Sequence, residues 1–311
     1  MSFFRVKKAL AVGVMLAGVP VFAQTEGQGQ GQAVVTVLPT HGNESPAALT
    51  QQDLTVKVNG KVSSITNLIP LRDANSPLEL VVMMDSGVQT SMATQLSEIR
   101  DFVKSLPPNA KVTLAYMENG VARLSGPLTS DHDAAIKGLH IPAGIPGGDA
   151  SPYFCLSDLA KNWPSNDRAA RREVIMISDG VDYYDARFDP EDPYMQAAIT
   201  DSVRAGLVVY SVYWENKGRF DRTSYGNASG QNLLLQVTQA TGGNSYWQGL
   251  GNPVSFRPYF QDIQRRLQNQ YELSFTAPLK NKPEVDNMKL KVNGISGKIA
   301  APGEVYVTRS M

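Results

Sequence analysis

Acidic and hydroxyl side chains follow two apolar segments of this sequence, in an order that could bind a hard cation. Asp85 and Ser86 follow one run of Leu, Val and Met residues, and Asp179 follows a second run. Asp149 lies between the two runs, directly after a pair of glycines. Carboxylate and hydroxyl oxygens are the ligands that Mg²⁺ and Ca²⁺ prefer in proteins. The candidate metal ligands are therefore Asp85, Ser86, Asp149 and Asp179.

The segments that carry these residues have the pattern of buried parallel strands. Each is a nearly continuous apolar run, without the alternation of a strand that has one solvated face. Stretches of helical periodicity separate the runs, which predicts an α/β fold with a doubly wound, mostly parallel sheet. Small molecules and ions bind to such sheets beyond the carboxyl ends of the strands. The candidate metal-binding side chains follow these strand ends. The predicted strands are 78–85, 111–117, 173–180 and 206–214.

The α/β domain spans residues 78–270, and its two flanks have a different pattern of apolar residues. Residues 33–77 and 271–311 are rich in Val and Thr, alternate in places, and contain turn signals such as Asn59-Gly60. Neither flank alone could bury an apolar face, so we expect them to pack together as a small β unit. The Gly/Gln tract at 24–32 has no large apolar side chain to bury and predicts a flexible linker.

The order of the acidic motifs resembles that of the von Willebrand factor type A (VWA) domain. The metal-ion-dependent adhesion site (MIDAS) of that family uses a D-x-S-x-S motif, a Thr in a middle loop, and the Asp of an S/T-D-G motif. Here the matching segments are Asp85-Ser86-Gly87, the loop around Asp149, and Ser178-Asp179-Gly180. The flanking sequence, including AALTQQDLTVKVNGK, is similar to that of the acidobacterial subfamily of VWA domains. The resemblance implies adhesion to, or assembly with, a protein or extracellular matrix partner.

The chain departs from the MIDAS pattern, so the site is degenerate. With Asp85 as the first ligand, Gly87 and Gln89 occupy the two serine positions. Shifting the register by one fits Ser86 but displaces the aspartate and the second serine. Asp149 stands at the expected threonine, with Ser151 as an alternative oxygen. Two interpretations stay open: a weak Mg²⁺ or Ca²⁺ site, or no metal, with the aspartates serving as turn formers.

Aromatic residues alternate with acidic ones after the second motif. This segment belongs to the same predicted edge of the sheet, where mixed aromatic and charged side chains are typical of a recognition surface. A solvated acidic loop is the alternative, because the spacing is not that of an EF-hand. For Tyr153, Phe154 and Trp214, which belong near this edge, core packing is an equal alternative. The predicted partner-binding rim is Tyr153, Asp182, Tyr183, Tyr184 and Asp185.

Composition excludes several functions. The 29 basic and 29 acidic residues balance, and no basic cluster occurs in the body of the chain, so nucleic acid is not an expected partner. One cysteine and three histidines leave few catalytic groups, and the common hydrolase and phosphate-loop motifs are absent from the sequence. We therefore expect a non-catalytic binding module. The alternatives are a metal-dependent hydrolase or accessory subunit, and an envelope scaffold without a ligand.

The first 23 residues have the order of a secretory signal peptide. Arg5, Lys7 and Lys8 precede the apolar run 9–21, and small residues before the bond after Ala23 suit a signal peptidase. The apolar run is shorter than the roughly 20 residues needed to cross a bilayer, and no later segment qualifies. The sequence predicts an exported protein, periplasmic or secreted, without a membrane span.

Overall fold

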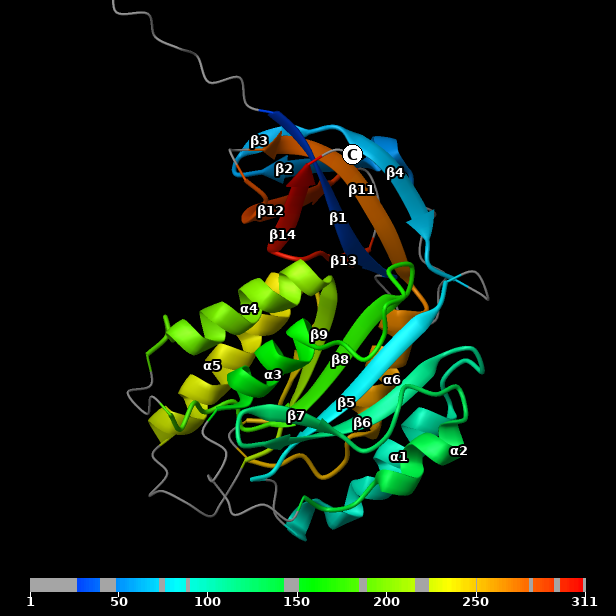
Figure 1. The fold of residues 1–311 in the computed structure, drawn as a ribbon, viewed down its shortest axis with the longest axis vertical. Coiled ribbons are helices and arrows are strands. Elements are labelled where there is room, and N and C mark those ends of the chain that lie inside the picture. The colour runs from blue at the N-terminus through cyan, green and yellow to red at the C-terminus, as the bar shows by residue number, and fades with distance from the viewer. Residues whose placement is uncertain are drawn as a thin grey trace, which may run out of the picture.

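The computed structural model divides the chain into two parts. One part is a six-stranded sheet covered by helices, and the other is an eight-stranded, largely antiparallel sheet that curls on itself. Figure 1 shows the eight-stranded sheet against the edge where the strands of the six-stranded sheet begin. The structure describes residues 27–39, 49–72, 76–87, 90–142, 151–184, 189–215, 224–249, 251–279, 282–293 and 297–309.

The six-stranded sheet has the order β10-β9-β8-β5-β6-β7. Its strands are parallel except β7, which returns antiparallel to β6. The chain starts in the middle at β5 and moves outward in both directions, as in doubly wound folds. The apolar runs predicted from the sequence are the four central strands, buried along most of their length. The bounds are β5 (Leu78–Asp85), β6 (Lys111–Glu118), β7 (Val121–Leu124), β8 (Arg171–Ser178), β9 (Leu207–Tyr213) and β10 (Ser245–Tyr246).

Helices cover both faces of this sheet and build two apolar cores. Helices α1, α2 and α6 pack on one face, and α3, α4 and α5 pack on the other. No helix in the described part of the chain is both long and apolar enough to cross a membrane. The bounds are α1 (Leu96–Lys104), α2 (His132–Ala135), α3 (Pro152–Lys161), α4 (Pro193–Ala205), α5 (Ser224–Thr241) and α6 (Arg257–Leu267), with short 3-10 turns at Gln51–Asp53, Thr90–Thr94 and Ile136–Gly138.

The eight-stranded sheet combines strands from both ends of the chain. Its order is β3-β2-β12-β14-β1-β11-β4, with β13 also paired to β1. It encloses a third apolar core, to which Val35, Leu273 and Phe275 contribute fully buried side chains. The bounds are β1 (Gly27–Leu38), β2 (Leu54–Val58), β3 (Lys61–Ser63), β4 (Ile65–Pro70), β11 (Gln270–Leu279), β12 (Glu284–Val292), β13 (Lys298–Ala300) and β14 (Glu304–Arg309).

The glycine-rich start of β1 corrects the prediction of a flexible linker at 24–32. Its glycines and glutamines alternate between the two faces of the sheet, with Gly29 and Gly31 buried and the glutamines exposed. A Cβ on Gly31 would lie 2.6 Å from the ring of Phe275, so the neighbouring side chain already fills that space. Glycine suits a strand where another group approaches the backbone closely. The tract is therefore half of a strand, while residues 1–26, with the predicted signal peptide, lie outside the described residues.

A buried carboxyl group lies where the two parts meet. Glu173, in β8, is fully buried, and its oxygens accept no hydrogen bond from the described residues. Arg171 donates instead to the carbonyl oxygen of Leu267, at 2.6 Å, and to Oε1 of Gln270, at 2.5 Å. Burial raises the pKa of Glu173 to about 7, although the charge of Arg171 and the polar groups of Gln270 and Tyr210 oppose the shift.

Candidate functional site

Two of the predicted ligands, Asp85 and Asp179, lie at the carboxyl ends of neighbouring parallel strands. Ser178 ends β8 and donates its hydroxyl to Oδ2 of Asp85, at 2.7 Å. The other oxygen of Asp85 accepts the backbone N–H of Gly87 at 2.9 Å. The hydroxyl of Ser178 in turn accepts the N–H of Gly180 at 3.0 Å. The pairing of β5 with β8 thus places Asp85 beside the Ser-Asp-Gly turn.

Asp179 is also engaged by its own loop. It is almost completely buried, and its Oδ1 accepts the backbone N–H of Val181 at 3.0 Å. Its Oδ2 accepts the hydroxyl of Tyr183 at 2.7 Å. A carboxylate stabilised by two donors of its own turn holds that turn in shape. The tyrosine hydroxyl was not anticipated, because nothing in the sequence fixes which carboxylate a tyrosine four residues away will meet.

The described residues do not fit a complete MIDAS-type metal site. All four oxygens of Asp85 and Asp179 accept hydrogen bonds from the chain itself. Ser86 is buried, and Asp149 lies outside the described residues. Within the described part of the chain, no three His, Cys, Asp or Glu side chains are arranged to hold an ion. Asp85 and Asp179 each accept the backbone N–H of the residue two positions later, which is the hydrogen bond of a turn-forming aspartate.

We predict that divalent ions stabilise the protein only slightly. The hydroxyl donors of Ser178 and Tyr183 compete with a cation for the carboxylates, so we expect a Kd above about 10⁻⁴ M. At roughly 1 mM free Mg²⁺, such a site adds at most about 1.4 kcal/mol to the free energy of unfolding. The melting temperature should then change by no more than about 5 °C between Mg²⁺ and chelator. Calorimetric titration with micromolar affinity, abolished in Asp179→Asn, would contradict this prediction.

The prediction that Tyr153 belongs to the partner-binding rim is wrong, because this side chain is fully buried beneath the site. It lies in the first turn of α3, where the hydroxyl of Ser151 caps the helix by accepting the N–H of Tyr153 at 3.2 Å. Its own hydroxyl donates to the carbonyl oxygen of Gly180 at 2.6 Å. Burial raises its pKa well above the usual value, and the nearby carboxylates, above all Asp179, raise it further. Tyr153 therefore supports the Ser-Asp-Gly turn from below.

The remaining predicted rim residues lie at different depths. Asp182 is also buried, and its Oδ1 accepts the backbone N–H of Tyr184 at 2.8 Å, so it shapes the loop rather than the surface. Tyr183 is half-buried because its hydroxyl reaches Asp179. Tyr184 is 61% exposed. Asp185 lies outside the described residues.

Three aromatic rings form a cluster around Tyr184. The ring of Tyr184 lies 5.3 Å from that of Phe154 and 5.2 Å from that of Tyr194, and the last two rings are 4.7 Å apart. Each pair meets edge to face, which is a favourable geometry for aromatic side chains. We call Phe154, Tyr184 and Tyr194 the aromatic cluster. The predicted rim did not include Phe154 or Tyr194, and only the proximity of α3 to α4 brings them together.

Further apolar side chains are exposed at the same edge of the sheet. Trp247 directly follows β10, and Val254, which is 90% exposed, precedes α6. Trp214, by contrast, is core: it is 2% exposed, and its ring packs 5.4 Å from that of Phe256. Figure 1 shows this edge at the end of the molecule opposite the eight-stranded sheet.

No protein-family model matches the chain, and no curated protein matches it. Similar solved structures include an aerotolerance-related membrane protein from Bacteroides fragilis NCTC 9343, with 17% identity, a TM-score of 0.43, and coverage of 61% of this chain and 98% of that one. BatB from Bacteroides thetaiotaomicron has 16% identity, a TM-score of 0.42, and coverage of 61% and 97%. Proximal thread matrix protein 1 from the mussel byssus, with a zinc-occupied MIDAS motif, has 13% identity, a TM-score of 0.41, and coverage of 62% and 48%. At these identities and TM-scores, the similarity does not indicate a function for this chain.

Proposed function

We propose that this chain is an exported, non-catalytic binding module that recognises a protein or matrix partner at the carboxyl-end edge of its six-stranded sheet. The observation that carries the proposal is the aromatic cluster with its exposed tyrosine, Tyr184. Exposed aromatic side chains on a rigid support are typical of the residues that contribute most to protein binding. Trp247 and Val254 extend the apolar surface along the same edge.

The hydrogen bonds beneath this surface support a rigid platform rather than a reactive centre. Asp85 and Asp179 are held by backbone amides and by the hydroxyls of Ser178 and Tyr183. Recognition by a preorganised surface loses little conformational entropy on binding. The proposal therefore keeps the VWA-type use of this edge for adhesion or assembly and replaces the metal bridge of MIDAS with direct side-chain contacts. Membership of the acidobacterial VWA subfamily and export remain predictions from the sequence.

Photochemical crosslinking tests this proposal at a single residue. We predict that p-benzoylphenylalanine at position 184 crosslinks the full chain to a discrete partner in extracts of the cell envelope and secreted material. The same group at position 62 is the control, because Val62 is 70% exposed on β3 of the other sheet. We expect at least five times more adduct at 184 than at 62, with no effect of chelator. Equal yields at both positions, or an adduct at 184 that requires Mg²⁺, would contradict the proposal.

A further inference from the structure

A cleft lies between the two parts of the molecule, at the end opposite the aromatic cluster. Its volume is about 570 Å³, within the range of small-molecule sites, and sites often occur where domains meet. Residues of β1, β4, β11 and β14 form one wall. The loop before β8, the start of β8, and the segment from α4 into β9 form the other wall. Nothing in the proposed binding function uses this cleft.

One wall presents a fixed cation. The guanidinium of Arg172 donates through Nη2 to the backbone carbonyl oxygens of Ser165, at 3.1 Å, and Asp167, at 3.2 Å. It also lies 5.6 Å from the centre of the Trp163 ring. These contacts hold the side chain in place, and the planar group has five N–H donors, so donors remain for a ligand. The carboxylates of Glu79 and Asp167 lie near this guanidinium, and Arg168, on the same wall, adds a second positive charge beside it.

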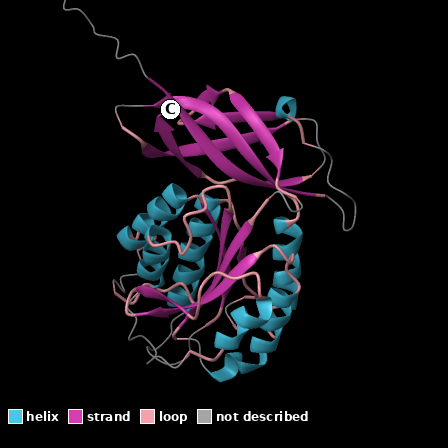
Figure 2. Cartoon of the chain, turned by 45° about the vertical axis from the view of Figure 1, so that its right-hand side comes forward, coloured by secondary structure: helices cyan, strands magenta, loops and turns pink. Residues whose placement is uncertain are grey.

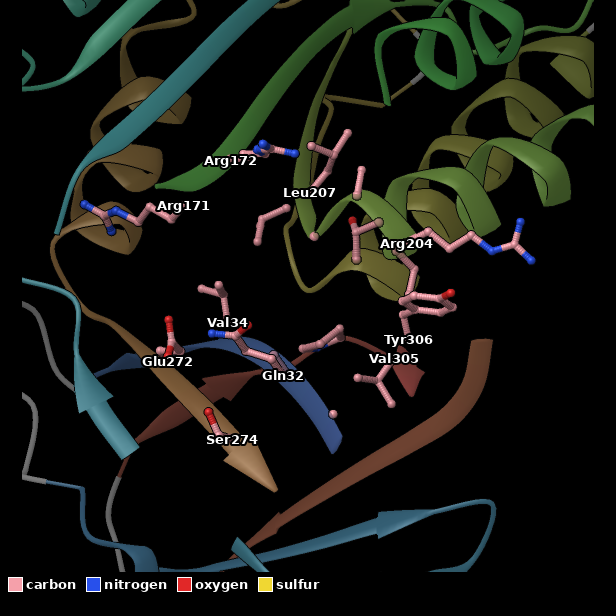
Figure 3. Close-up of a pocket in the computed structure, with 18 of the residues that line it drawn as sticks. Gln32, Val34, Arg171, Arg172, Arg204, Leu207, Glu272, Ser274, Val305 and Tyr306 are labelled. Atoms are coloured by element: carbon pink, nitrogen blue, oxygen red, sulfur yellow. The ribbon is translucent and has the colours of Figure 1, made fainter. Parts of the chain in front are cut away.

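The opposite wall presents carboxylates. Glu272 of β11 and Glu304 of β14 line the cleft, and both are half-buried. Among the described residues, neither side-chain carboxylate forms an ion pair or accepts a hydrogen bond. Burial raises the pKa of Glu304, as expected for a carboxylate without a compensating cation. Figure 3 shows Glu272 on the sheet wall, with Gln32 and Ser274 nearby, and Arg172 on the wall above.

We propose that this cleft binds a small zwitterion, an amino acid or a short peptide, with its carboxylate at Arg172 and its ammonium at Glu272. Arginine pairs with carboxylates through parallel N–H···O bonds, and a carboxylate accepts the hydrogen bonds of an ammonium group. A ligand with two opposite charges would place its carboxylate beside Arg172 and Arg168 on one wall and its ammonium beside Glu272 on the other. The amide of Gln32 and the hydroxyl of Ser274 supply neutral groups between the charges, which suit a peptide bond.

Calorimetric titration of the full chain with defined probes tests the inference. The probes are L-alanine, trialanine, N-acetyl-trialanine, which lacks the ammonium, and trialanine amide, which lacks the carboxylate. We expect a Kd of about 0.1 to 1 mM for at least one of the two zwitterions, given the usual affinity per atom of small ligands. Comparing alanine with trialanine separates an amino-acid site from a peptide site. Each blocked peptide should bind at least tenfold more weakly than trialanine or, where only alanine binds, show no binding.

Two single substitutions test whether the zwitterion binds in the cleft. Glu272→Gln should weaken zwitterion binding at least tenfold without changing the melting temperature, because Glu272 has no partner to lose among the described residues. Arg204→Gln is the matched control, since its guanidinium points away from the cleft in Figure 3 and its removal should leave the Kd unchanged. The inference is overturned if neither zwitterion binds at 10 mM, if blocked peptides bind equally well, or if the two variants lose affinity alike. The crosslinking result at position 184, which tests the proposed binding function, does not depend on any of these three results.

Discussion

Replacing Glu173 with glutamine is expected to change the pH dependence of stability by about 3 kcal/mol. Burial raises the pKa of Glu173 from an ordinary value of 4.5 to about 7, a difference worth roughly 1.4 kcal/mol for each pKa unit. The folded protein therefore holds this proton more tightly than the unfolded chain does. The contribution to stability is complete below pH 4.5 and is lost as the pH rises to 7. Glutamine does not titrate, so the variant should lack this loss.

The measurement is urea denaturation of both proteins from pH 4 to pH 8.5. The stability of Glu173→Gln relative to the unmodified protein should rise by about 3 kcal/mol across this range and level off above pH 7.5. Glu79→Gln is the contrasting control at an equally buried glutamate. Trp163 donates to Glu79 at 2.8 Å and Lys111 lies 3.8 Å from it, so this variant should be less stable at pH 8. A stability difference for Glu173→Gln that is independent of pH would contradict the prediction.

Replacing Gly230 with alanine is expected to lower the free energy of unfolding by about 2 kcal/mol. Gly230 lies in α5 where the helix touches the turn after β8, and a Cβ there would overlap the carbonyl oxygen of Asp179 and lie 3.0 Å from Val181. The helix would have to move away from the turn, and because the overlap is with a backbone atom we expect a cost at the upper end of the usual range for overpacking, about 3 kcal/mol. The better helix propensity of alanine, roughly 1 kcal/mol, offsets only part of this cost.

Thermal and urea denaturation measure this effect, which corresponds to a decrease in melting temperature of about 4–8 °C. Gly126→Ala is the matched control, because a Cβ at Gly126 meets no atom within 4 Å. Its melting temperature should stay within about 1–2 °C of that of the unmodified protein. Crosslinking from position 184 should also decrease in Gly230→Ala, because the turn after β8 leads to Tyr184. Equal stability of the two alanine variants would show that α5 does not restrain the turn.

The parallel strands could be predicted from the sequence because their burial on both faces leaves a strong signal. The runs containing Val82, Leu114, Ile175 and Val209 are apolar at consecutive positions, and these side chains are completely buried. The edge of the sheet at which the candidate site lies could be predicted from the same strands, because Asp85 and Asp179 come at their carboxyl ends. This much depends on local patterns.

The details of the site depend on contacts between distant segments, which local patterns do not encode. The sequence placed Tyr153 near the binding edge and left its burial open, and the packing of α3 buries it against Gly180. The hydroxyl of Tyr183 occupies an oxygen of Asp179 that a metal could have used. Gly31 appeared to belong to a linker because its strand-like alternation is carried by glycine, whose missing side chain is replaced by Phe275.

The position of β1 determines the order in which the protein can fold. β1 begins at Gly27, yet its neighbours β11, β13 and β14 all come after residue 269. A chain synthesised from its N-terminus must therefore hold this strand unpaired until residues 270–279 of β11 are available. Contacts so far apart in sequence form slowly, because a long loop must close first. The six-stranded sheet has all of its strands earlier, so closure of the eight-stranded sheet around β1 is expected to be the late, rate-limiting step.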